Sequence, residues 1–202
     1  TFYYNEFGAY LRGIFGCKVQ KITLDGGFTC PNRDGKVGHG GCTYCNNQTF
    51  NPAYCHRHLP VRDQMLEGIS FFAHKYPAMR YLAYFQAYTN TYASLDNLKQ
   101  RYEEALSVEG CVGLVIGTRP DCMPDEILDY LQMLAGRTFV LVEYGIESVN
   151  DDTLLRINRG HDYACAADAV RRTAARGIPV GAHMILGLPG EDREELMRQA
   201  CV

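Results

Sequence analysis

Apolar positions along the chain switch between helical and strand-like spacing. Residues 2–14 place apolar side chains three and four residues apart, which is typical of an amphipathic helix. Residues 19–24 alternate with a period of two, as a half-buried strand does. Residues 26–60 show no sustained periodicity and are rich in Gly, Pro and Asn, so they are expected to form a long loop.

After this loop, strand and helix patterns follow one another regularly. Strands are predicted at 81–86, 111–116, 138–143 and 178–186, and helices at 61–76, 94–108, 124–134, 151–157, 162–177 and from 191 onward. Ser94 and Asp162 are the expected N-caps of two of these helices. Strands that alternate with helices of this length favour βα units and a parallel sheet.

Polar residues follow several predicted strands, notably Gln86, Thr118 and Arg119, Glu147, and the turn at 187–189. In parallel α/β folds the ligand site lies at the carboxyl ends of the strands. We therefore expect these residues to gather beside the long loop.

The composition is that of a globular chain. With 202 residues, 47% hydrophobic and 21% charged, disorder, collagen and coiled coil are excluded. No apolar run approaches the roughly 18 residues of a membrane helix, and no signal peptide is visible, so a cytoplasmic protein without a membrane partner is expected. We expect one domain over 1–202, with an amino-terminal helix (1–15), the loop 26–60 and βα units over 61–202, and a truncated carboxyl end.

Charge is unevenly distributed along the chain. Residues 1–62 carry 7 Lys and Arg against 3 Asp and Glu, a net of +4, whereas the remainder carries 13 against 20, a net of −7. A basic front end favours an anionic partner, with ordinary solvated loop charges as the alternative. The balance does not reach that of a dedicated nucleic-acid-binding domain.

Nine cysteines give the strongest chemical signal. The number is odd and five of the cysteines are scattered, unlike a secreted disulfide framework, so a reducing compartment is expected. Cys30, Cys42 and Cys45 follow the spacing C-x11-C-x2-C, with Cys55 close behind. Soft thiolates select zinc or an iron–sulfur cluster.

Three readings of these cysteines remain open. Three close thiolates with one open position suit a catalytic centre, whereas structural zinc takes four ligands. A zinc-stabilised nucleic-acid-binding module would use Cys30, Cys42, Cys45 and Cys55. A metal-independent barrel enzyme with a nucleophilic cysteine is the third reading, although no cysteine is visibly paired with a base.

The motifs resemble those of the radical SAM enzymes. A C-x-x-C pair with an aromatic residue before its second cysteine follows the first strand of a βα series. The gap of eleven residues before this pair departs from the usual C-x3-C-x2-C. Longer gaps occur in the elongator-type tRNA-modifying branch and in a small bacterial family that carries blocks like GFTCPNRDG, YFQAY and GTRPDC of this chain.

This resemblance implies a fold and a chemistry. The fold would be a partial (β/α)6 barrel with parallel strands that lacks its last strand here. Cys30, Cys42 and Cys45 would each hold one iron of a [4Fe-4S] cluster, and S-adenosylmethionine would bind the fourth. Reductive cleavage of S-adenosylmethionine to a 5′-deoxyadenosyl radical would follow, inside a barrel that excludes water and oxygen.

The resemblance also implies cofactor-binding residues. Tyr44 is the aromatic residue inside the C-x-x-C pair. Gln86 and Ala87 fall where the family has a glycine-rich turn that holds the methionine amino group. This chain lacks those glycines, so both could act only through main-chain groups.

Glu147, Arg159 and His183 complete the expected cofactor site. Glu147 stands where relatives carry Gln, and Arg159 follows it by twelve residues. His183 stands where relatives have a polar residue facing the adenosine. Each has a structural alternative, namely an ion-pair partner for Glu147, a helix-end residue for Arg159 and a core histidine for His183. Gly117 stands where the elongator-type branch has an acidic residue, which removes one expected contact.

The expected partners are a substrate and an electron donor. The elongator-type resemblance and the basic front end both favour tRNA as the substrate, and a small metabolite would fit the same barrel. A flavodoxin or ferredoxin is the expected donor.

Overall fold

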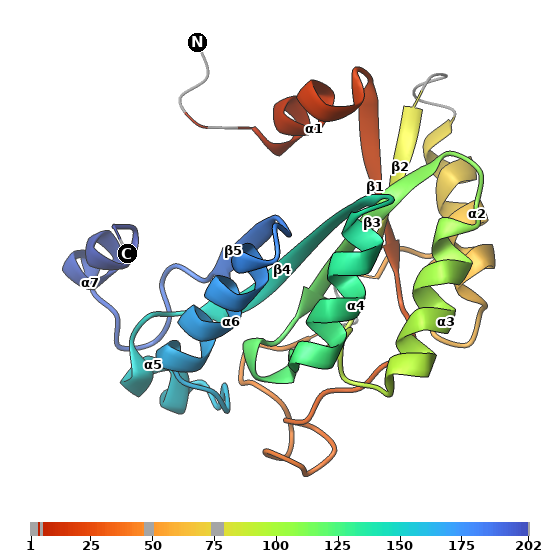
Figure 1. The fold of residues 1–202 in the computed structure, drawn as a ribbon. Helices are drawn as coiled ribbons and strands as arrows, with labels where there is room; N and C mark the ends of the chain where they lie inside the picture. Colours follow the sequence, from red (N-terminus) through yellow and green to blue (C-terminus); the bar gives the residue numbers. More distant parts are fainter. Residues whose placement is uncertain (1–3, 5, 47–50, 74–78, 202) are drawn as a thin grey trace.

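The fold is a curled parallel sheet, seen in a computed structural model that describes residues 4, 6–46, 51–73 and 79–201. The sheet consists of β1 (Lys18–Leu24), β2 (Met79–Phe85), β3 (Cys111–Thr118), β4 (Phe139–Glu147) and β5 (Val180–Met184). The order across it is β1-β2-β3-β4-β5, and every pairing is parallel. Figure 1 shows the strands curving into a half-barrel, which confirms the predicted fold class.

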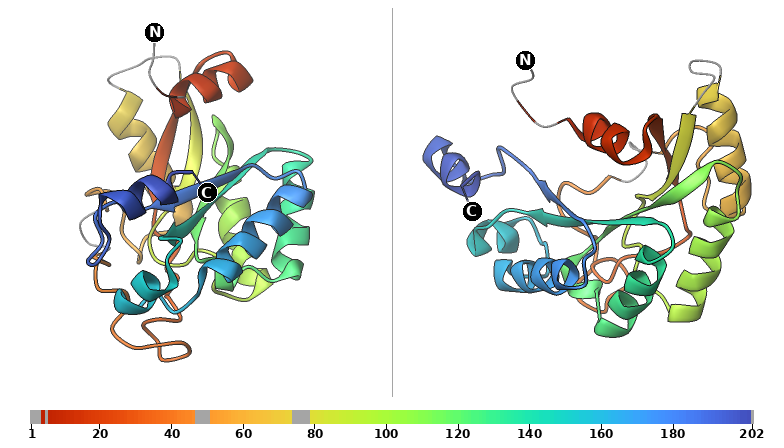
Figure 2. Two further views of the ribbon diagram at one scale, coloured as in Figure 1. Left: turned by 90° about the vertical axis from the view of Figure 1, so that its left-hand side faces the viewer. Right: turned by 45° about the horizontal axis from the view of Figure 1, so that its top comes forward.

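Four helices cover the convex face of the sheet: α2 (Val61–Ala73), α3 (Leu95–Leu106), α4 (Asp125–Ala135) and α6 (Tyr163–Ala175). They form an outer arc in the right-hand view of Figure 2. Alternate strand residues such as Phe85, Ile116 and Val142 are fully buried against them. This layer is the main hydrophobic core.

The concave face changes character along the strands. At the amino-terminal end it is apolar, and α1 (Phe7–Phe15) covers it by packing Leu11 against Val115 and Leu141. Side chains on one face of a strand are two residues apart, so the next positions on this face are Gly117 and Glu143. The half-barrel is therefore closed by an apolar layer at one end and polar at the carboxyl ends of its strands.

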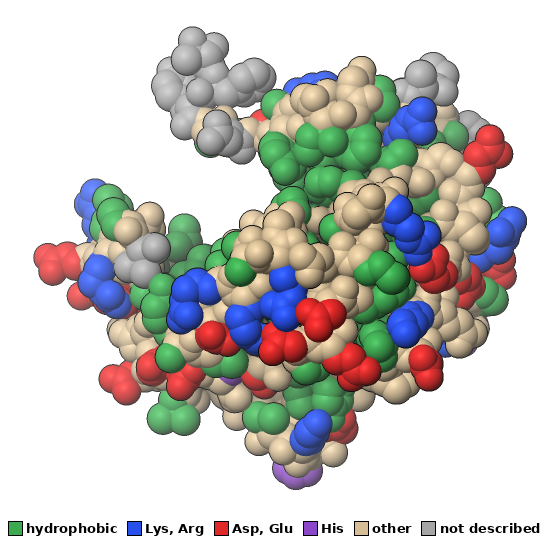
Figure 3. Space-filling view, viewed as in Figure 1, with side chains coloured by type: hydrophobic (Ala, Val, Ile, Leu, Met, Phe, Trp, Pro, Cys, Tyr) green, Lys and Arg blue, Asp and Glu red, His purple; other side chains and the backbone are tan. Residues whose placement is uncertain are grey.

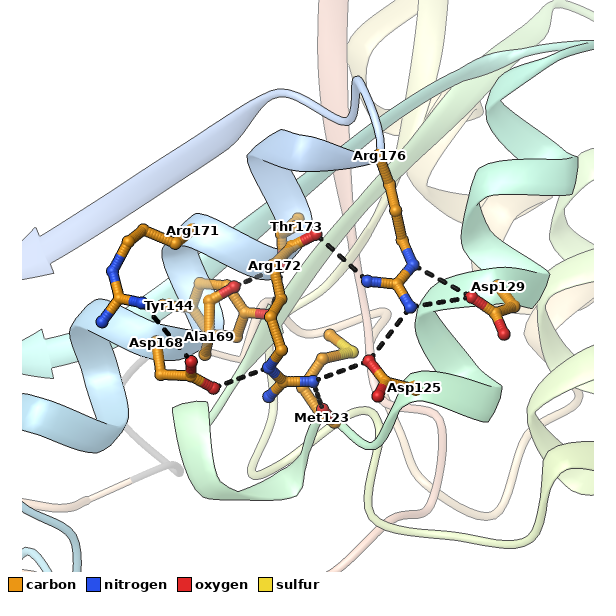
Figure 4. Close-up of polar contacts among 10 residues, drawn as sticks. All are labelled: Met123, Asp125, Asp129, Tyr144, Asp168, Ala169, Arg171, Arg172, Thr173 and Arg176. Atoms are coloured by element: carbon orange, nitrogen blue, oxygen red, sulfur yellow. Dashed lines mark hydrogen bonds and ion pairs between the residues drawn. The ribbon is translucent and has the colours of Figure 1, made fainter.

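Ion pairs join α4 to α6 on the outer surface, where Figure 3 shows acidic and basic side chains interleaved. Arg176 lies 3.0 Å from Asp125 and 2.9 Å from Asp129, and Arg172 lies 3.2 Å from Asp125. Arg172 also donates to the carbonyl of Met123 at 2.9 Å (Figure 4). These contacts hold two helices side by side and lie outside the polar concave face.

The shorter elements are η2 (Pro120–Cys122), α5 (Asp151–Arg156) and α7 (Arg193–Gln199). Asp162 caps α6 as predicted by accepting from the backbone N–H of Cys165 at 2.8 Å. Ser94 is the N-cap residue of α3 as predicted, although its side chain makes no capping hydrogen bond. Among the described residues, none of the helices has the length and apolarity needed to cross a bilayer.

The element boundaries differ from the predictions in a few places. The first helix begins at Phe7, and the predicted start at residues 2–3 lies outside the described residues, as do 74–76 of the next helix. β4 runs four residues beyond its predicted end, to Glu147, because residues 144–147 continue the pairing with β5. In the described part of 26–60 there is no α-helix or strand beyond a single bridge between Asp34 and His39, as predicted for a loop.

Candidate functional site

The long loop brings the three predicted metal ligands to one cavity. Cys30, Cys42 and Cys45 line a cavity of about 630 Å³. The rest of its wall comes from the carboxyl ends of the strands, including Gln86 after β2 and Glu147 at the end of β4. The structure therefore gathers Gln86, Thr118, Arg119 and Glu147 beside the cysteines as predicted, whereas the turn at 187–189 does not line this cavity and packs Leu188 against Leu154 and Ile157 instead.

The turn after α5 anchors the loop in this position. Asn158 donates from its side chain to the carbonyl of Gly41 at 2.8 Å, and its own carbonyl accepts from the side chain of Asn32. The same Asn32 amide nitrogen lies 3.5 Å from Cys42 Sγ. Asn158 adopts a φ of 56°, a left-handed conformation that asparagine tolerates. Elements far apart in the sequence thus hold the cysteine loop.

Arg119 lies beside the first cysteine. Its side chain is almost fully buried and grips Asp121 through two nitrogens, at 2.8 and 2.9 Å. Its Nη1 points to Cys30 Sγ at 3.9 Å. A bidentate ion pair with a carboxylate fixes the orientation of a guanidinium, so Arg119 holds an N–H group pointing at the sulfur of Cys30.

Arg159 and Glu147 form a buried pair beside the second cysteine. Arg159 Nη2 lies 3.6 Å from Glu147 Oε1 and donates to the carbonyl of Gly145. Arg159 Nη1 points to Cys42 Sγ at 3.7 Å. Burial raises the pKa of Glu147, and the charge of Arg159 opposes this shift.

The backbone and one free donor mark this pair as more than an ion bridge. Glu147 has a φ of 73°, in the left-handed region that non-glycine residues rarely adopt. Such conformations persist only where the surroundings enforce them. The buried Nε of Arg159 finds no hydrogen-bond partner among the described residues. Arg159 thus carries one unsatisfied donor within the wall of the cavity.

The other predicted cofactor residues fall in different places. The side chain of Tyr44 lines the cavity and reaches both Glu147 and Cys42, and burial raises its pKa. Gln86 also lines the cavity. Ala87 is buried at 3% exposure and does not line the cavity.

A charged cluster from β1, β4 and β5 lies at the inner end of the cavity, where Glu143 and His183 line it and Lys21 contacts Glu143. Glu143 lies 2.5 Å from Lys21 Nζ and 3.2 Å from His183 Nε2. His183 is exposed toward the cavity, so the core-histidine alternative is wrong. These cations and the hydroxyl of Tyr84 outweigh the effect of burial and lower the pKa of Glu143 to about 2. The hydrogen bond that His183 donates to the carboxylate of Glu143 raises the pKa of His183.

Glu143→Gln is expected to destabilise the chain by about 1–3 kcal/mol, since hydrogen bonds to a charged group are lost. The loss of stability will be greater near about pH 5.5 than near about pH 9. Protonated His183 stabilises the fold through its ion pair with Glu143, fully below the unfolded pKa of 6.5, and this effect is lost as pH rises through the higher folded pKa of His183. Glu143 keeps its charge down to about pH 2, so it does not limit the pair in this range.

Urea unfolding at both pH values measures the difference. Glu126→Gln is the matched control, because Glu126 is exposed on α4 and forms no ion pair in the described part of the chain. An equal loss at the two pH values would show that His183 does not depend on Glu143.

Comparison with known proteins identifies the fold's family. The model of the family described as "Radical SAM superfamily" matches residues 31–198, which is most of the chain. The chain belongs to the radical SAM superfamily.

Two bacterial proteins illustrate this membership. "Uncharacterized protein YtqA" of Bacillus subtilis is 43% identical over 197 residues, covering 98% of this chain and 61% of that protein. "Protein YhcC" of Escherichia coli is 44% identical over 195 residues, covering 96% of this chain and 62% of that protein. The chain thus spans about three fifths of the length of these radical SAM relatives.

A solved structure shares the fold. The archaeal Methanocaldococcus infernus Elp3 with an amino-terminal deletion superposes with a TM-score of 0.62 at 17% identity, covering 90% of this chain and 41% of that chain. At this identity the likeness concerns the fold alone. The elongator-type resemblance is supported by sequence, since "Elongator complex protein 3" of Homo sapiens is 33% identical over 100 residues, covering 49% of this chain and 17% of that protein.

Radical SAM membership implies a [4Fe-4S] cluster and S-adenosylmethionine, and the residues at the cavity fit both groups. The cysteines supply soft ligands. The buried Nε atoms of Arg33 and Arg159 lack partners among the described residues. Unpaired cationic donors beside thiolates suit sulfur and carboxylate acceptors.

The zinc alternative finds no support in the structure. Cys55 is 2% exposed in the hydrophobic core, packed with Leu24 and Tyr54, and does not line the cavity. Within the described residues, no three His, Cys, Asp or Glu side chains are grouped for a single metal ion. Sulfur ligands of one zinc ion, each at about 2.3 Å, must lie within about 4 Å of each other. The thiolates of a [4Fe-4S] cluster bind separate irons, so they can lie farther apart.

Cys55→Ala is expected to leave iron and acid-labile sulfide unchanged and to cost about 1 kcal/mol of stability through a small cavity. Burial raises the pKa of Cys55 to about 12, so this thiol stays protonated and is a poor metal ligand at neutral pH. Iron, sulfide and zinc assays on the reconstituted chain measure the outcome. Loss of metal in this variant would restore the four-cysteine reading.

Sequence reasoning missed Lys21, Arg33 and Glu143 at the cavity. Glu143 ends the apolar run FVLV, and a carboxylate at that position of a buried strand was an available signal. Lys21 interrupts an apolar strand in the same way. Arg33 had no signal of its own, because loop residues 26–60 follow no periodicity from which a direction can be inferred.

Proposed function

We propose that Cys30, Cys42 and Cys45 bind a [4Fe-4S] cluster and that the cavity beside them binds S-adenosylmethionine. The observation that carries the proposal is the convergence of the three cysteines on the cavity that Glu147 and Arg159 also line. When bound, the two groups supply reductive cleavage of the sulfonium and a 5′-deoxyadenosyl radical for hydrogen abstraction.

The chain's own residues would bind and orient the second group. Arg159 lines the cavity with a guanidinium that the carbonyl of Gly145 holds in orientation, which suits the carboxylate of the methionine part. Glu147 and Tyr44 offer acceptors and a hydroxyl to a ribose. His183, on the neighbouring strand β5, lines the same cavity and would offer a ring nitrogen to the adenosine part.

The concave face excludes water from one end. α1 seals the amino-terminal end with apolar side chains, and the charged cluster of Lys21, Glu143 and His183 lies above this seal. A reactive carbon radical needs such a closed site, because water and oxygen would quench it.

Anaerobic reconstitution of the full chain tests the proposal. About four iron and four acid-labile sulfide per chain are expected, together with release of 5′-deoxyadenosine when dithionite and S-adenosylmethionine are added. One tightly bound zinc with no iron or sulfide would overturn the proposal.

The proposed substrate class is tRNA, supported by the elongator-type resemblance. The basic front end supports it less than its net of +4 suggests, because Lys21 pairs with Glu143 and Arg33 lines the cavity. Bulk tRNA is expected to stimulate 5′-deoxyadenosine release by the reduced chain. Stimulation by nucleosides but not by tRNA would replace tRNA with a small metabolite.

A further inference from the structure

Each cysteine of the C-x11-C-x2-C motif has one arginine beside it. Two of these contacts reach the sulfur atom and the third reaches the cysteine's backbone carbonyl. The pairs are Arg119 Nη1 with Cys30 Sγ at 3.9 Å, Arg159 Nη1 with Cys42 Sγ at 3.7 Å and Arg33 Nη2 with Cys45 O at 3.0 Å. The three guanidinium groups thus surround the cysteines from different elements.

Arg33 differs from the other two in its charge balance. Arg119 is neutralised by Asp121, and Arg159 is paired with Glu147. Arg33 forms no ion pair with any carboxylate of the described residues, and its buried Nε has no hydrogen-bond partner there. Arginine stays protonated at any working pH. Arg33 is therefore an uncompensated positive charge beside the cysteines.

The loop is built to hold Arg33 in this position. Its backbone N–H bonds to the carbonyl of Cys30 at 2.8 Å, and its guanidinium lies 5.7 Å from the ring centre of Tyr88. Gly41 has a φ of +84°, and a Cβ there would lie 2.9 Å from Arg33 Nε. Gly41 therefore leaves the space that the guanidinium fills. Both residues belong to the segment that separates the first two cysteines.

We infer that Arg33 raises the reduction potential of the [4Fe-4S] cluster by holding a fixed positive charge beside Cys45, and that Gly41 makes room for it. The inference rests on the proposed function. Reduction transfers one electron from a donor to the cluster, with no bond formed or broken. A neighbouring cation stabilises the more negative reduced state, and partial burial keeps the interaction from being fully screened.

Redox titration of the reconstituted full chain, without S-adenosylmethionine, tests the inference. The electron paramagnetic resonance signal of the reduced cluster is recorded as the solution potential is lowered stepwise with dithionite. Arg33→Gln is expected to lower the equilibrium constant for reduction about tenfold, which equals about 59 mV for one electron. Arg33→Lys keeps the charge and is expected to shift the potential less than half as far. Gly41→Ala is expected to shift it in the same direction as Arg33→Gln.

Lys36→Gln is the matched control. Lys36 lies in the same loop, and its replacement removes one positive charge, as Arg33→Gln does. Its ammonium lies 5.2 Å from the ring centre of Tyr92 and contacts none of the three cysteines in the described structure. The reduction potential of the cluster in Lys36→Gln is expected to equal that of the unmodified chain. An equal shift in Lys36→Gln and Arg33→Gln would overturn the inference, because general charge and not Arg33 would set the potential.

The remaining outcomes also decide between explanations. An unchanged potential in Arg33→Gln with full iron content overturns the inference and leaves the proposed function intact. If Arg33→Gln takes up no cluster, Gly41→Ala with full iron content decides, and an unchanged potential in that variant overturns the inference. Absence of iron and sulfide from the unmodified chain would instead overturn the proposed function itself.

Discussion

Replacing Cys30, Cys42 or Cys45 singly by alanine is expected to reduce bound iron and sulfide from about four of each per chain to near zero. Each thiolate would hold a different iron of the proposed cluster, so two remaining ligands would not retain it. Release of 5′-deoxyadenosine should fall to background. Iron and sulfide assays after anaerobic reconstitution, followed by a single-turnover assay with dithionite, measure both effects.

Cys111→Ala and Cys122→Ala are the controls for this series. Cys111 lies in β3, and Cys122 lies in η2 and does not line the cysteine cavity. Both should keep full iron content. Retention of full iron in any one of the three ligand variants would remove that cysteine from the ligand set.

Arg159→Met is expected to destabilise the chain by about 3–5 kcal/mol and to abolish measurable S-adenosylmethionine binding. Removal of the cation leaves the carboxylate of Glu147 buried without its partner, which is the costly way to break a buried pair. Urea unfolding measures the first effect, and equilibrium dialysis of the reconstituted chain measures the second.

The double variant Glu147→Gln/Arg159→Met separates the two roles. It removes the buried charge and is expected to recover part of the lost stability, while S-adenosylmethionine binding stays lost. Recovery of binding together with stability would show that Arg159 acts only as a structural partner of Glu147.

Much of this fold could be predicted because parallel strands with helical cover have a clear period. The apolar run 111–116 and the alternation at 19–24 match β3 and β1 closely. The end of β4 could not be predicted, because residues 144–147 are held by pairing with β5 across a register shift between Gly145 and Glu147. Such a long-range effect leaves no local pattern.

The part of the site that forms a spaced motif could be predicted from the sequence, whereas contacts between residues far apart in the sequence could not. The spacing of the cysteines and their likeness to a known motif pointed to Cys30, Cys42 and Cys45. The pairing of Lys21 with Glu143 joins residues 122 positions apart and depends on the curl of the sheet. Likewise, only the folded loop shows that Arg33 fits into space left by Gly41.

The sequential strand order has a consequence for how the chain matures during synthesis. Each strand pairs with the one made just before it, so the sheet can grow at one edge as the polypeptide emerges. The segment around Cys42 cannot be fixed in this order. The carbonyl of Gly41 accepts a hydrogen bond from the side chain of Asn158, which is 117 residues further along, and the N–H of Thr43 donates to the carbonyl of Ile157. The backbone beside Cys42 is therefore anchored only after α5 and the turn that follows it are complete, so a cluster that needs all three cysteines in place would be inserted late in synthesis.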